Sequence, residues 1–111
     1  MIEQMLRDYL LDQLAVPAYL ERPADPPERY VLIEKTGGGQ RNRLQSATLA
    51  LQSHAESLYQ AALLNEAVKG AMEQAVALPE ISSAKLNSDY NFTDTTTREY
   101  RYQAVYDVTY Y

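Results

Sequence analysis

The sequence contains no cysteine, no tryptophan and a single histidine among its 111 residues. The absence of cysteine excludes disulfides, thiolate metal sites and cysteine nucleophiles. One histidine, His54, is too few for a zinc site that relies on several histidines of one chain. We therefore expect the domain to contain no disulfide and to bind no cofactor.

Positive charge is also scarce, and no long apolar run is present. The chain has 10 Lys and Arg residues against 15 Asp and Glu residues, which gives a formal net charge of -5. This balance disfavours binding through phosphate neutralisation, so we expect no sequence-specific nucleic-acid partner. No stretch approaches the roughly 20 continuous apolar residues of a membrane span, so we expect no membrane partner. The amino terminus combines acidic residues with periodic apolar ones, which predicts folded structure there and not a secretory signal.

Apolar residues recur at helical spacing in two segments and follow strand-like patterns in five others. The predicted elements, in chain order, are a helix over 2–14, a short strand over 18–21, strands over 30–35 and 44–52, a helix that begins at a capping box over 53–56 and ends near 77, and strands over 81–90 and 98–111. This order predicts a single α+β domain over 1–111. Its sheet should be mainly antiparallel, with four to five strands packed against two helices.

Three consecutive glycines follow the strand over 30–35. Glycine adopts positive φ angles readily, so this segment predicts a flexible turn in an antiparallel hairpin with an extended basic tip. A nucleotide-binding loop is excluded because no Gly-Lys-Ser/Thr follows and the loop leads into a strand. The candidate partner-binding loop comprises Gly37, Gly38, Gly39, Gln40, Arg41, Asn42 and Arg43. An acidic protein surface suits its two arginines at least as well as nucleic acid, and an ordinary solvated tip is the alternative.

Other polar groupings favour structural roles. Asp89, Asn91 and Thr93 alternate like the first ligands of a calcium loop, but Asp94 and Tyr100 occupy the positions that require Gly and Glu. His54 lies beside the capping box, which favours a structural or exposed role over a general base. The acidic residues over 21–28 flank prolines, so a charged surface loop is expected. We therefore predict no catalytic residue, no metal site and no enzymatic activity.

Tyrosine is unusually frequent, with five of the ten tyrosines between positions 100 and 111. An alternating set on the last strand suits either the hydrophobic core or a subunit interface. The two tyrosines at the chain end are expected to contact a neighbour. The segment over 22–28 holds three prolines, which indicates a stiff exposed connection or a sheet edge. The candidate subunit interface comprises Pro23, Pro26, Pro27, Tyr100, Tyr102, Tyr110 and Tyr111.

Several phrases together suggest a family. They are ERPADPPERYVLIEKTGGG over 21–39, ATLALQ over 47–52, YNFTD over 90–94 and the pair Tyr102-Gln103. In element order, length and these phrases, nearly the whole chain resembles the tail terminator, or tail completion, proteins of long-tailed bacteriophages and prophages. No catalytic residue is carried over, because the family resembled is structural.

The resemblance implies a structural virion protein that forms a hexameric ring on the finished end of the tail tube. Such a ring ends tube polymerisation and presents a surface for head–tail joining. The implied partners are further copies of the chain, the tail tube protein and the head–tail connector protein. The implied location is the virion tail, assembled in the cytoplasm of the host bacterium.

Two other classes of function remain open at the level of sequence. A small non-enzymatic adaptor, or another connector or neck protein, would use the same sheet for a single partner. An adaptor would stay monomeric or dimeric, whereas a terminator would form a ring. An enzyme with an unrecognised site is the third class, which the failed motif tests disfavour.

Overall fold

The computed structural model describes every residue from Met1 to Tyr111, and its elements follow the predicted order. They are α1 (Ile2–Gln13), β1 (Ala18–Tyr19), β2 (Tyr30–Arg41), β3 (Leu44–His54), α2 (Leu58–Glu73), the short 3-10 helix η1 (Ala75–Ala77), β4 (Ile81–Asn91) and β5 (Arg101–Tyr110). The α+β fold, with its two helices and five-stranded sheet, is confirmed.

The five strands form one sheet in the order β1-β2-β3-β5-β4. All neighbouring pairs are antiparallel except the two-residue β1, which runs parallel to β2. The long antiparallel strands are arranged as two hairpins, β2–β3 and β4–β5. The strand order leaves β4 at one edge of the sheet and β1, with the remainder of β2, at the other.

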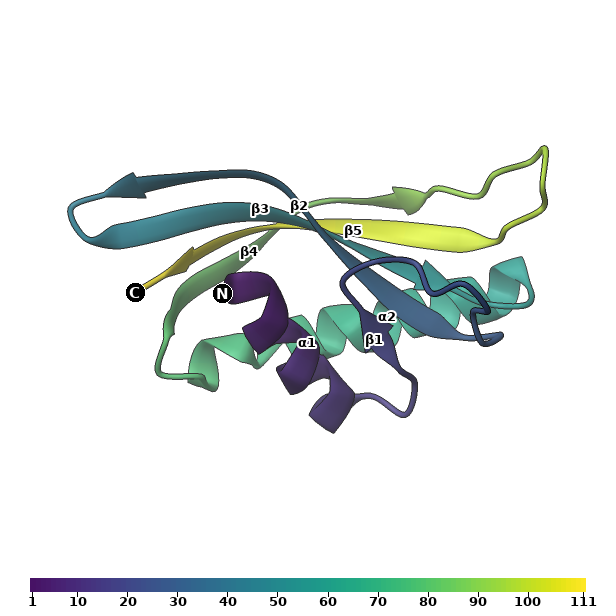
Figure 1. Cartoon of the computed structure of the whole chain (residues 1–111), viewed down its shortest axis with the longest axis horizontal. Coiled ribbons are helices and arrows are strands. Elements are labelled where there is room, and N and C mark those ends of the chain that lie inside the picture. The colour runs from purple at the N-terminus through teal and green to yellow at the C-terminus, as the bar shows by residue number, and fades with distance from the viewer.

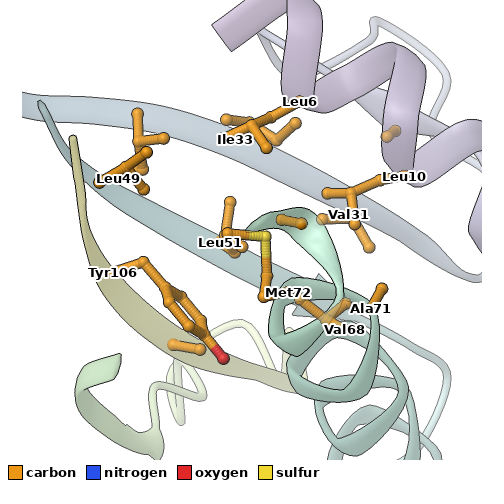
Figure 2. Packing of buried hydrophobic residues seen from close by; sticks show 14 of the residues in the cluster. Leu6, Leu10, Val31, Ile33, Leu49, Leu51, Val68, Ala71, Met72 and Tyr106 are labelled. Atoms are coloured by element: carbon orange, nitrogen blue, oxygen red, sulfur yellow. The ribbon is translucent and has the colours of Figure 1, made fainter. Parts of the chain in front are cut away.

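Both helices cover the same face of the sheet (Figure 1). Figure 2 shows the core between them, where Leu6 and Leu10 of α1 lie beside side chains of β2, and Met72 of α2 lies beside Leu51 of β3. The Tyr9 hydroxyl donates a hydrogen bond to the carbonyl of Ala71 at 2.6 Å, which joins the two helices. This single apolar layer holds the strands that carry the surfaces described below.

The predicted capping box at 53–56 is wrong. The chain stays in β3 through His54, whose backbone pairs with Arg101 of β5. The helix begins later, where the Ser57 hydroxyl caps α2 by accepting a hydrogen bond from the Gln60 amide at 3.1 Å. The pairing with β5 continues the strand past the point where local sequence favours a helix. The Ser53 hydroxyl is buried in consequence and has no hydrogen-bond partner.

The predicted flexible glycine turn is also wrong. β2 continues through Gly37, Gly38 and Gly39, which pair with Thr48, Ala47 and Ser46 of β3. None of these glycines has a positive φ. The chain reverses instead at Asn42 and Arg43, whose φ angles of 51° and 68° are those of a two-residue hairpin turn. The hairpin is therefore an ordered ribbon, and it extends beyond the helices (Figure 1).

Candidate assembly interface

Two long strand edges carry no backbone partner. β1 pairs only with Val31 and Leu32, so the outer side of β2 is unpaired from Ile33 to Arg41. The outer side of β4 is unpaired along Ile81–Asn91. Exposed edges of this length present free N–H and C=O groups that another chain can pair with. They lie on opposite sides of the sheet, so one molecule offers two different edges.

The β4 edge is irregular. Its pairing with β5 shifts between Ile81 and Ser83 and again between Leu86 and Ser88. Bulges of this kind restrict which strands can add to an edge. Between the bulges Leu86 remains 47% exposed although it faces the helix side of the sheet. This edge combines selective backbone pairing with an uncovered apolar side chain.

A groove runs between the β4 edge and α2. It encloses about 340 Å³. Its lining residues are Glu66, Lys69, Gly70, Glu73, Ala84, Leu86 and Tyr106. The groove is thus floored by apolar side chains of the sheet and walled by charged side chains of the helix.

Ion pairs fix the charge of this groove. The Lys69 ammonium donates a hydrogen bond to Asp89 at 2.5 Å and contacts a Glu66 carboxylate oxygen at 2.9 Å, and these two contacts raise the pKa of Lys69. Burial by itself would raise the pKa of Asp89, but hydrogen bonds from Lys69 and Asn65 outweigh it and lower that pKa. Lys69 is therefore occupied by two carboxylates, and Glu73 has no cationic partner. The groove carries an excess of negative charge.

The β2–β3 hairpin carries the opposite charge. Lys35, Arg41 and Arg43 are exposed, and none forms an ion pair with a carboxylate of the chain. Arg41 ends β2 and Arg43 lies in the turn, so the basic tip lies where the sequence predicts it. The predicted loop residues through Arg41 are paired with β3, and only Asn42 and Arg43 form the turn. This pairing gives the two arginines a defined position.

A chain of hydrogen bonds crosses the face of the sheet that the helices leave uncovered. Nε2 of His54 lies 3.2 Å from Oε1 of Gln52, Gln52 donates to Gln103 at 2.9 Å, and Gln103 donates to the Tyr90 hydroxyl. His54 also stacks on the ring of Tyr30, with centroids 4.4 Å apart. Each amide accepts at its oxygen and donates at its nitrogen, so the chain requires a proton on Nε2 of His54.

Burial is the main cause that lowers the pKa of His54, to about 4, and the charge of Arg101 adds to it. The imidazole is therefore neutral near pH 7. The predicted structural role fits this position, because His54 is buried and its contacts are an aromatic ring and a glutamine.

The proline segment does not form a sheet edge. Pro23, Pro26 and Pro27 lie in the loop between β1 and β2. Arg22 holds this loop to Glu99 at 2.6 Å, and Arg29 pairs with Glu56. These ion pairs fasten the loop to the β3–α2 junction and to the segment before β5.

The tyrosines of β5 divide between core and surface. Tyr106 and Tyr110 belong to the hydrophobic core, so the prediction that Tyr110 lies outside the core is wrong. It pairs with Ile81 of β4 at the β5 end, where the sheet is still covered by the helix layer. Tyr100 and Tyr102 are half-buried, and Tyr111 is 72% exposed. Among the four tyrosines of the predicted interface, Tyr111 is the most open to a partner.

The residues that alternate like the ligands of a calcium loop make contacts within the chain. Asp89 binds Lys69 and Asn65, and the Asn91 side-chain oxygen accepts a hydrogen bond from the Thr93 amide at 3.0 Å. No group of three His, Cys, Asp or Glu side chains is placed to hold a metal ion. No helix is long and apolar enough to cross a membrane.

Sequence reasoning missed the groove and both free edges. A partial signal existed in Gly70, a helix-weakening residue that faces open space in α2. Edge position itself depends on strand order, which local patterns do not specify. Comparison of the sequence with known protein families and with curated proteins finds no match.

Proposed function

We propose that this chain is a structural virion protein of the tail-terminator type, which forms a closed ring on the end of a tail tube and offers a surface for head–tail joining. The resemblance in sequence supports this assignment. The single histidine is used within the fold, where it stacks on Tyr30 and lies 3.2 Å from Gln52.

The observation that carries the proposal is the pair of free strand edges on opposite sides of one sheet. β2 and β4 run antiparallel to one another, because two strands lie between them and every intervening pair is antiparallel. The β4 edge of one copy can therefore pair antiparallel with the β2 edge of a second copy in the same orientation. Contacts of this head-to-tail kind close into a ring under rotational symmetry and leave no free edge.

A ring with strands along its axis would have two unlike ends. The molecule measures 44 Å along its longest axis. The basic tip of the β2–β3 hairpin lies at one end, and the loop between β4 and β5 lies at the other (Figure 1). Unlike ends suit a subunit that meets a tube on one side and a connector on the other. In the proposed assembly the arginines of the tip provide electrostatic selectivity for one of these partners.

The absolute mass in solution tests the proposal. Light scattering should be recorded over a range of protein concentrations, alone and with the candidate tail tube protein. We expect a ring of several subunits, formed either by the chain alone or only on the tube. A chain that stays monomeric and ignores the tube at every concentration contradicts the ring and favours a single-partner adaptor.

A further inference from the structure

We propose that Lys35 of each subunit enters the acidic groove between α2 and β4 of its neighbour, where it lies beside Leu86 and close to Glu66 and Glu73. The occupant of the groove is thus the β2 edge of a second copy of this chain. This inference rests on the proposed ring, and it specifies which residues meet at the joint between subunits.

The register of the sheet identifies the residues. Lys35 pairs with Leu49, Leu49 with Tyr106, and Tyr106 with Leu86, so these four residues form one row across the sheet. Directly paired residues share a face, and Leu49 and Tyr106 face the helices. Lys35 and Leu86 are therefore the two ends of a row on the helix side.

Ring symmetry then continues the row. In the proposed joint two neighbouring copies meet without a shift along their strands, so that the row ending at Leu86 in one copy continues at Lys35 of the next. The Lys35 side chain would project toward α2 of that neighbour, into the groove lined by Glu66, Glu73 and Leu86.

Charge and exposure agree with this placement. Lys35 has no carboxylate partner within its own chain, and Glu73 has no cationic partner within its own chain. Leu86 is the large apolar residue that the free subunit leaves exposed on the helix side of this edge. The lysine stem can cover Leu86 while its ammonium reaches the carboxylates of α2.

Gly70 gives a further argument for an occupant. It lies inside α2, yet an added Cβ would have no atom within 4 Å, so packing within the subunit does not require glycine there. Glycine in a helix interior is less favourable than alanine by about 1 kcal/mol. Because Gly70 lines the groove, its missing side chain leaves room for the chain that enters from outside.

Disulfide trapping tests the contact directly, since the natural chain contains no cysteine. The double variant Lys35→Cys/Leu86→Cys should be oxidised under conditions in which the unmodified chain forms rings. Within one chain the two positions are three strand spacings apart, about 14 Å, which is too far for a disulfide. We expect a ladder of covalent oligomers that ends at the ring size.

The matched control is Glu34→Cys/Leu86→Cys, which moves one cysteine by a single residue to the opposite face of β2. We expect no ladder from it. If the unmodified chain forms rings but the first variant gives no ladder, the Lys35 contact is overturned and the ring proposal stands. Equal ladders from both variants have the same meaning. Covalent dimers without higher species indicate a two-fold contact and overturn it as well. An unmodified chain that remains monomeric with and without the tube protein overturns both proposals.

Substitutions without cysteine provide a second readout. Lys35→Glu or Glu73→Lys should raise the protein concentration needed for half-maximal assembly at least tenfold, and the combined variant should restore most of it. Arg98→Glu, a charge reversal in the loop between β4 and β5, should change that concentration less than twofold. Gly70→Leu should fill the groove and block assembly while leaving the thermal transition of the subunit as high as before. Assembly unaffected by Lys35→Glu, Glu73→Lys and Gly70→Leu contradicts the proposed contact.

Discussion

Gly70 lowers the stability of α2, although no contact within its own subunit requires glycine at this position. No atom lies within 4 Å of where its Cβ would stand, and its φ is not in the left-handed region. We expect Gly70→Ala to raise the free energy of unfolding by about 0.5–1 kcal/mol, because alanine restricts the unfolded chain and favours the helix. Urea denaturation measures the change. The reverse exchange Ala67→Gly, at an exposed position of the same helix, should lower stability by a similar amount.

His54 makes stability depend on pH. Burial, assisted by the charge of Arg101, lowers its pKa from 6.5 to about 4, so between these values the unfolded chain binds a proton that the folded chain does not. The contribution of neutral His54 to the free energy of unfolding is therefore fully present above about pH 6.5 and is lost as the pH falls toward 4. The loss reaches about 2 kcal/mol at pH 5. Urea midpoints recorded between pH 7.5 and 5 should show this loss.

The variant His54→Gln separates this contribution from that of the carboxylates. Glutamine keeps a hydrogen-bond donor for Gln52 but does not titrate, so its stability should be nearly flat over the same interval. Hydrogen bonds from arginine lower the pKa of Glu56 and of Glu99, so their contribution is lost at lower pH. A variant with the same loss as the natural chain between pH 7.5 and 5 would show that another group is responsible.

At the scale of the elements, the β2–β3 turn places an arginine in a conformation that suits glycine. The φ of Arg43 is 68°, and its side chain makes no ion pair. We expect Arg43→Gly to stabilise the chain by about 1 kcal/mol, because an L side chain is strained in the left-handed region and Asn-Gly is the preferred sequence for this turn. Thermal unfolding is the measurement. Arg41→Gly, in the strand beside it, should instead destabilise the chain, and a loss of stability with Arg43→Gly would contradict the assignment of strain.

The same hairpin shows what the sequence could and could not predict. Helical and alternating apolar patterns predicted both helices and every strand in the correct order, since burial on one face imposes those periods. The predicted glycine turn is wrong because pairing with β3 holds these glycines extended, which no local preference reveals. The predicted helix start at Ser53 is wrong for the same reason, because the backbone of Ser53 pairs with β5 from the far end of the chain. Local patterns predicted the basic tip but missed the groove, since the groove joins a helix to a strand whose edge position depends on the complete sheet order.

At the scale of the whole molecule, the distribution of charge gives the two ends different characters. The hairpin end presents Arg41 and Arg43, while the acidic residues over 21–28 lie in the loop that Arg22 holds to Glu99. The overall charge is -5, so the basic tip is a local exception on an acidic protein. A tip of this kind accelerates association with an acidic surface.

Two arginines at opposite ends of the molecule allow a controlled test of this polarity. Arg43 and Arg98 are both exposed, both lack an ion pair and both have positive φ, at 68° and 58°. We expect Arg43→Glu to slow association with one of the two partners, tube or connector, by about tenfold at low salt, and to weaken the salt dependence of that rate. Arg98→Glu, an equal change in net charge, should leave the rate of association with the same partner within about twofold, and both variants should still form rings.

Stopped-flow association rates at several ionic strengths provide the measurement. Equal rates for Arg43→Glu and the natural chain with both partners would show that the basic tip does not face either of them, because reversal of an interfacial charge must change the encounter rate.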